Sequence, residues 1–145
     1  MVLIEDCIRD ILIYCKENID YKILADGSFT IRPVSLKELL DSKLQYKYEQ
    51  KDIMYSVLKL EEIGFIKISN RIPRNQHYYI NDCNINELTY SAHKFIGTIE
   101  SDTIWNRTKD TISKVGNHTL NFIETVAHDV AVESAKEFIK IGTGQ

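Results

Sequence analysis

The 145-residue chain has little cysteine, proline or glycine, with three, two and six residues of each. Cys7, Cys15 and Cys83 form neither a CxxC pair nor a cluster, so a disulfide scaffold is excluded and reduced, structural thiols in a cytoplasmic protein are expected. The scarcity of proline and glycine, together with 43% apolar residues, indicates a folded protein rather than a linker or a disordered chain.

The sequence also lacks the patterns of membrane, catalytic and metal-binding proteins. No run approaches the roughly 18 apolar residues of a membrane span, and no basic region precedes an apolar run near the N-terminus, so neither a membrane span nor a signal peptide is expected. There is no glycine-rich phosphate loop and no nucleophile elbow. The four histidines have no metal-ligand spacing. We therefore expect a protein that binds rather than catalyses, with no catalytic residues, no metal and no cofactor, and no membrane as its partner.

The stretch from Tyr48 to Ile80 has the order of a recognition helix followed by a β-hairpin wing. An amphipathic pattern predicts a helix from near Glu49 to Gly64, a glycine that suits the left-handed position after a helix. Alternating apolar residues then predict a strand over residues 65–72, FIKISNRI, and a returning strand over residues 77–80, HYYI, after the polar tip PRNQ.

Two elements are predicted at the start of the chain. Apolar residues recur at helical spacing from Leu3 to Cys15, which predicts a helix over residues 3–17. Residues 18–34 contain the turn pair Asp26-Gly27, which predicts either a small hairpin or one strand with a loop. Pro33 predicts that any strand there is an edge strand or ends at Arg32.

A short helix is predicted next. Ser35 and Glu38 match a capping box, in which the Ser35 hydroxyl accepts a hydrogen bond from the Glu38 amide and the Glu38 side chain reaches back. The polar residues 41–43 then break the helix before the longer helix that starts near Glu49. A short helix, a turn and a longer helix are the parts of a helix-turn-helix.

Three further helices are predicted towards the C-terminus. The first is capped by Thr89, the second contains Trp105 on its apolar face and ends at Gly116, and the third runs from about Thr119 to Ile141. Trp105 is expected to be buried. The apolar side of the last helix either packs on the N-terminal helix or pairs two copies of the chain as a homodimer.

Positive charge is concentrated around the predicted recognition helix and wing. Residues 43–79 have seven basic and four acidic side chains, a net charge of +3, whereas the chain as a whole carries −3. A basic face can contact phosphate, and amide side chains can read base edges. The alternative is ordinary scatter of surface charge, and Glu49 and Asp52 would repel phosphate. The candidate DNA-binding residues are Lys47, Tyr48, Lys51, Tyr55, Lys59, Arg71, Arg74, Asn75 and Gln76.

Tyrosines crowd the same region, at positions 46, 48, 55, 78 and 79. Such rings can stack on bases or sugars. They can equally be half-buried packing residues with a hydrogen-bonded hydroxyl, or belong to a protein interface, where tyrosine is enriched.

A family resemblance rests mainly on the second half of the chain. The residues that carry it are Leu88-Thr89, His93 with Phe95, Asp102, Trp105 and Lys109, together with the upstream LKLEEIGFI and the strand after it. This pattern resembles an uncharacterised family of bacterial and phage proteins, domain of unknown function 2513, although Ala92 stands where members usually have glycine. The resemblance covers most of residues 1–140. It implies a winged-helix-like fold and a home in phages, prophages and Gram-positive genomes, and it supplies no ligand or catalytic residues.

The sequence thus predicts a mainly helical α+β fold, a winged helix-turn-helix with additional C-terminal helices. Residues 1–100 are expected to form the winged domain and residues 101–145 a helical extension for packing or dimerisation. The predicted function is binding of duplex DNA by a phage or prophage transcriptional regulator. The alternative is a phage-encoded adaptor or inhibitor that binds a protein partner through the same surface.

Overall fold

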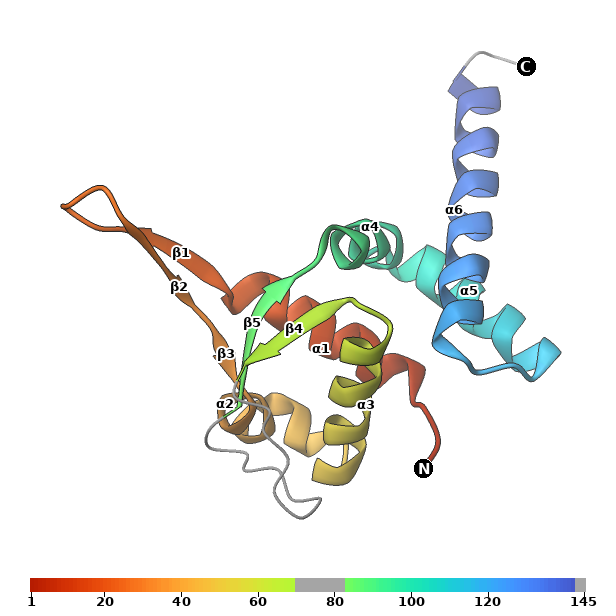
Figure 1. The fold of residues 1–145 in the computed structure, drawn as a ribbon. Helices are drawn as coiled ribbons and strands as arrows, with labels where there is room; N and C mark the ends of the chain where they lie inside the picture. The colour runs from red at the N-terminus through yellow and green to blue at the C-terminus, as the bar shows by residue number, and fades with distance from the viewer. Residues whose placement is uncertain (70–82, 143–145) are drawn as a thin grey trace. The chain divides into compact units, whose positions relative to one another are not determined.

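The computed structural model describes residues 1–69 and 83–142, which form a mostly helical α+β protein. These residues contain six α-helices, one 3-10 helix and two small sheets (Figure 1). The chain divides into two compact units, Met1–Ala92 and His93–Gln145. The expected boundary at residue 100 stays a prediction. In chain order the elements are α1 (Glu5–Asn18), β1 (Asp20–Ile23), β2 (Phe29–Arg32), β3 (Val34–Ser35), α2 (Leu36–Asp41), η1 (Lys43–Tyr46), α3 (Gln50–Glu62), β4 (Ile66–Ser69), β5 (Asn84–Leu88), α4 (Tyr90–Ile99), α5 (Asp102–Val115) and α6 (Leu120–Gly142).

Helix α1 supplies much of the core of the first unit. It packs against α3, η1 and β5. Its fully buried residues are Cys7, Ile8, Ile11, Leu12 and Cys15. Burial raises the pKa of the Cys7 thiol to about 11 and that of Cys15 to about 12, so both thiols stay protonated at neutral pH. All three cysteines are buried and none forms a disulfide, as expected of structural thiols.

The ends of α2 and α3 follow the capping signals. The Ser35 hydroxyl accepts a hydrogen bond from the Glu38 amide at 3.0 Å, as predicted. Helix α3 is preceded by Glu49 and followed by Gly64, whose φ of 85° is the left-handed conformation expected there. Between the two helices lies η1, which the sequence did not predict and whose start is capped by Ser42. Inside α3 a serine, Ser56, is buried with the apolar side chains, and its hydroxyl donates to the Asp52 carbonyl.

The first unit also contains a three-stranded antiparallel sheet, with the strand order β3-β5-β4. The predicted strand after Gly64 is present as β4. Its partner is β5, which the sequence did not predict, and the pairing has an irregularity between Lys67 and Ile68. The returning strand predicted over residues 77–80 lies outside the described residues.

A second sheet consists of β1 and β2 alone, paired as an antiparallel hairpin. The hairpin turns at Asp26-Gly27, with Gly27 at a φ of 86°, and β2 ends at Arg32 before Pro33, both as predicted. Figure 1 shows it extending away from the helices and the other sheet of the same unit. All eight of its strand residues are exposed.

The second unit is built on the pairing of α5 and α6. Ser101 caps α5, and Gly116 follows it at a φ of 79°. Trp105, Thr108 and Ile112 are buried on α5, whereas Val115 near its end is exposed. Helix α6 has 23 residues against 14 in α5, and its last buried residue is Val130. The part of α6 beyond that point leaves Phe138, Ile139 and Ile141 exposed.

We expect Trp105→Ala to lower the free energy of unfolding by about 3–5 kcal/mol, because removing a buried indole leaves a cavity that the surroundings fill only in part. Trp105 is 1% exposed, so the expectation that it is buried is confirmed. Denaturant unfolding followed by far-UV circular dichroism measures the change. The control is Tyr46→Ala at an 83% exposed residue, which should change stability by less than about 0.5 kcal/mol. Equal effects of the two substitutions would contradict the prediction.

Candidate nucleic-acid interface

The outward face of α3 holds three of the predicted DNA-binding residues. Lys51, Tyr55 and Lys59 are spaced four residues apart and therefore lie along one side of the helix. The opposite side is buried through Ile53, Val57 and Leu60. Lys51 is exposed, whereas Tyr55 and Lys59 are half-buried, and the Lys59 ammonium lies 5.4 Å from the centre of the Tyr55 ring.

Each lysine on or near this face has an acidic neighbour. The Lys51 Nζ lies 3.3 Å from Glu49 Oε2, and the Lys59 Nζ lies 2.7 Å from Glu62 Oε2. This hydrogen bond to Glu62, with the charge of the same carboxylate, raises the pKa of Lys59. On β4, Lys67 Nζ lies 3.5 Å from Glu87 Oε2. These pairs are solvent-exposed, so each contributes little stability, but each offsets the positive charge locally.

Lys47 and Tyr48 lie just before α3 and are tied to α1. The Tyr48 hydroxyl donates to Asp10 Oδ2 at 2.7 Å, and Lys47 Nζ lies 3.3 Å from the same oxygen. Tyr48 is half-buried, and burial, followed by the hydrogen bond to Asp10, raises its pKa. Its hydroxyl therefore serves to join two elements of the fold, which is the packing role that the sequence left open for these tyrosines.

Four of the predicted residues, Arg71, Arg74, Asn75 and Gln76, lie outside the described residues. Within residues 1–69 and 83–142 the candidate interface is therefore the α3 face formed by Lys51, Tyr55 and Lys59, with Lys47 and Tyr48 beside its start.

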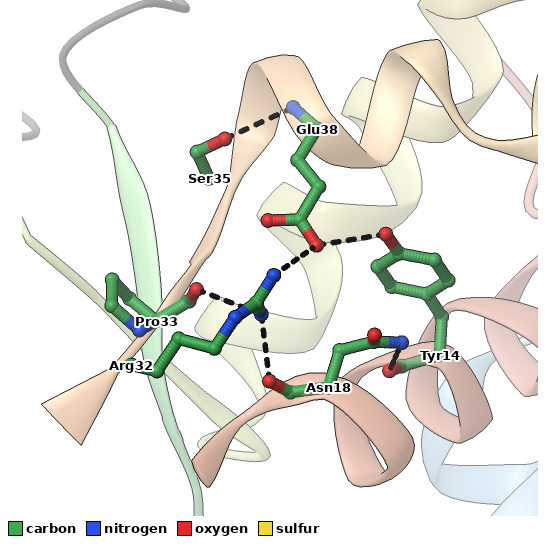
Figure 2. A network of polar contacts seen from close by, with 6 residues as sticks. All are labelled: Tyr14, Asn18, Arg32, Pro33, Ser35 and Glu38. Carbon is green, nitrogen blue, oxygen red and sulfur yellow. Dashed lines mark hydrogen bonds and ion pairs between the residues drawn. The ribbon is translucent and has the colours of Figure 1, made fainter. Parts of the chain in front are cut away.

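A polar junction around Glu38 was missed by the sequence analysis (Figure 2). Glu38 Oε2 accepts a hydrogen bond from the Tyr14 hydroxyl at 2.8 Å and lies 3.2 Å from Arg32 Nη2. Arg32 Nη1 donates to the Asn18 carbonyl at 2.7 Å. The junction thus joins α1, the base of the hairpin and α2. Glu38 was predicted to complete a capping box at Ser35, and its carboxylate instead has partners from α1 and β2.

A groove of about 570 Å³ lies beside this junction, along α1 and η1. Its lining includes the apolar side chains Ile13 and Leu44, with Asp10 and Lys43 among the charged ones. Both signs of charge therefore line the groove.

The described residues provide neither a cluster of metal ligands nor a helix suited to cross a membrane. In residues 1–69 and 83–142, no group of three or more histidine, cysteine, aspartate or glutamate side chains is placed to hold a metal ion. No helix in that part of the chain has both the length and the apolar character needed to cross a membrane.

The fold defines a small, mostly helical α+β protein of two compact units. A family model described as "Hypothetical protein (DUF2513)" matches residues 3–118, and the chain belongs to that family. The resemblance stated from the sequence is confirmed, and the match ends before α6. No curated protein and no solved structure matched the chain.

The Tyr14–Glu38 bond should make stability fall in alkaline solution. Burial, then the hydrogen bond to Glu38, raises the pKa of Tyr14 from 10.0 to about 12. A raised folded-state pKa means that the contribution of Tyr14 is fully present below pH 10, its unfolded value, and is lost as the pH rises through 12. We expect Tyr14→Phe to cost about 1 kcal/mol at pH 8, with the difference from wild type vanishing towards pH 12.

Denaturant titrations at a series of pH values measure this difference. Tyr46→Phe, at an exposed tyrosine, is the matched control and should follow the wild-type profile throughout. A Tyr14→Phe deficit that stays constant across the alkaline range would contradict the assignment.

Proposed function

We propose that the first unit is a winged helix-turn-helix domain that binds duplex DNA through α3. The support is its chain order, α1, β3, α2, α3, β4 and β5, with the antiparallel sheet order β3-β5-β4. That is the order of helices and strands in a winged helix, with the β1–β2 hairpin as an insertion between α1 and β3. Helices α2 and α3, separated by η1, are then the two helices of the helix-turn-helix.

The observation that carries the DNA proposal is the outward face of α3. A recognition helix must present cationic and hydrogen-bonding groups to the groove while its other side is held in the core. Lys51 and Lys59 would contact phosphates, and Tyr55 between them would contact a sugar or a base. Lys47, and the wing residues Arg71 and Arg74, would add backbone contacts. In this proposal the protein is a transcriptional regulator, in the phage or prophage setting that the resemblance implies.

The acidic neighbours lower the affinity that the α3 face can have for DNA. A phosphate that approaches Lys51 also approaches Glu49, and one that approaches Lys59 approaches Glu62. Because exposed ion pairs contribute only about 0–1 kcal/mol, a phosphate can replace the carboxylate as the partner of each lysine. The repulsion between the phosphate and the displaced carboxylate remains. Affinity is therefore limited by the acids as much as it is provided by the lysines.

A second candidate function, a protein-binding adaptor, is favoured by the same pairs. Lys47, Lys51, Lys59 and Lys67 each lie within 3.5 Å of a carboxylate, so the face is close to neutral locally. A nearly neutral surface with a central tyrosine suits a protein partner, since tyrosine is enriched and unpaired charge is depleted in protein interfaces.

Removing the lysines of these ion pairs and removing their carboxylates should have opposite effects on DNA binding. Lys51→Ala with Lys59→Ala should weaken binding to all duplexes and reduce the slope of log affinity against log salt by about two units. Glu49→Gln with Glu62→Gln should strengthen binding at low salt, because the lysines lose their competing carboxylates. Glu49 makes no side-chain capping hydrogen bond, so glutamine there removes no helix cap. Fluorescence anisotropy with a library of genomic duplexes over a range of salt measures both effects.

The matched control removes two lysines from the second unit, Lys114→Ala with Lys136→Ala. Lys114 is paired with Asp110 at 2.9 Å on an exposed helix face, much as Lys59 is paired with Glu62. This control should leave the salt slope unchanged. If no duplex binds at low salt, or if the α3 variants and the control behave alike, DNA is not the partner and the adaptor function leads.

A further inference from the structure

The β1–β2 hairpin is an amphipathic ribbon. Side chains alternate between the two faces of a strand, and the register pairs Tyr21 with Ile31 and Ile23 with Phe29. These four apolar side chains therefore share one face. The other face holds Asp20, Lys22, Thr30 and Arg32, so every charged side chain of the two strands lies on that side.

The apolar face is open to solvent. Tyr21 is 55% exposed, Ile23 76%, Phe29 63% and Ile31 37%. The rings of Tyr21 and Phe29 contact one another, with centroids 6.1 Å apart, which orders part of the face in advance. A two-stranded ribbon has no second layer of its own and is marginally stable in water. Its alternating pattern is that of a sheet with one buried face.

The base of the ribbon is held firmly by the junction in Figure 2. Arg32, the last residue of β2, donates to the Asn18 carbonyl at the end of α1 and pairs with Glu38 of α2. Asn18 precedes β1 by two residues, so both strands are anchored where they leave the helices. A surface held in this way loses little conformational entropy when it docks.

We propose that this apolar face binds the same face of a second copy of the chain, with the two ribbons packed about a two-fold axis. A two-fold contact places one surface patch against itself, so the patch must be self-complementary. An uncharged apolar face meets this requirement, because neither copy buries a charge against the other. Two ribbons packed face to face form a two-layer, four-stranded sandwich that covers the apolar side chains of both.

The available area fits a weak but specific dimer. Aromatic side chains bury roughly 150–250 Å² each, so the two partly exposed rings and the two smaller isoleucines together offer on the order of 500 Å² per copy. Two copies then bury about 1,000 Å², at the lower limit of specific interfaces. The dimer is therefore expected to form at micromolar concentrations rather than to be permanent.

Sedimentation velocity of the full chain over a concentration series tests the proposal. Wild type should be dimeric at high micromolar concentration. Ile23→Thr with Phe29→Thr should weaken dimerisation at least tenfold, and threonine is chosen because it keeps a high strand propensity. The matched control is Lys22→Thr on the opposite face of β1, which should leave the dissociation constant unchanged. A second comparison variant, Phe138→Ser, alters the exposed end of α6 and should also leave it unchanged.

Disulfide cross-linking tests the contact independently and changes only one residue of the ribbon. The native cysteines are buried, so Ile23→Cys introduces an exposed thiol on the apolar face. Mild oxidation should convert Ile23→Cys into a covalent dimer much faster than Lys22→Cys, whose thiol lies on the other face. A chain that stays monomeric at every concentration overturns the proposal. So does a dimer that Phe138→Ser abolishes and the ribbon variants leave intact, because that result assigns the contact to α6.

Discussion

The packing of the buried side of α1 against α3 is the constraint on which the first unit depends. Five residues of α1 have no exposed surface, so the helix cannot rotate without bringing them into water. The facing side of α3 is buried through Ile53, Val57 and Leu60. The opposite side of the helix, with Lys51, Tyr55 and Lys59, therefore points away from the core. The same helix also fixes where α3 begins, because Asp10 accepts from Tyr48 and pairs with Lys47. The candidate interface is thus a consequence of the core.

The net charge counted along the sequence differs from the charge that surrounds the same residues in the folded unit. A count along residues 43–79 gives a positive segment, but a count includes only neighbours in sequence. In the folded unit, Asp10 of α1 lies beside Lys47, and Glu87 of β5 lies beside Lys67. Both acids come from outside the segment. The positive field over α3 is therefore weaker than the count suggests, which reduces the attraction of phosphate and suits a protein partner.

Local signals predicted the helices well, and the contacts between distant segments could not be predicted. Ser35, Gly64 and Gly116 cap or end helices through hydrogen bonds and backbone angles set within a few residues, so their effect can be read from the sequence. By contrast, β5 is a strand because β3 and β4 lie on either side of it, and its own residues, NINEL, alternate too weakly to predict one. Glu38 carried a correct local signal through its amide, while its carboxylate bonds to Tyr14, 24 residues away.

The first unit presents two surfaces whose chemistry responds in opposite ways to salt. Contacts between lysine and phosphate release counterions and weaken as salt rises. Burial of the apolar face of the ribbon is not weakened in that way, and strongly hydrated salts such as sulfate strengthen it. Moderate salt would therefore separate the two, because α3 would lose its ligand while the ribbon contact persisted. If both surfaces are used, pairing through the ribbon links two α3 faces and raises the affinity of a dimer for DNA only where both faces can reach it at once.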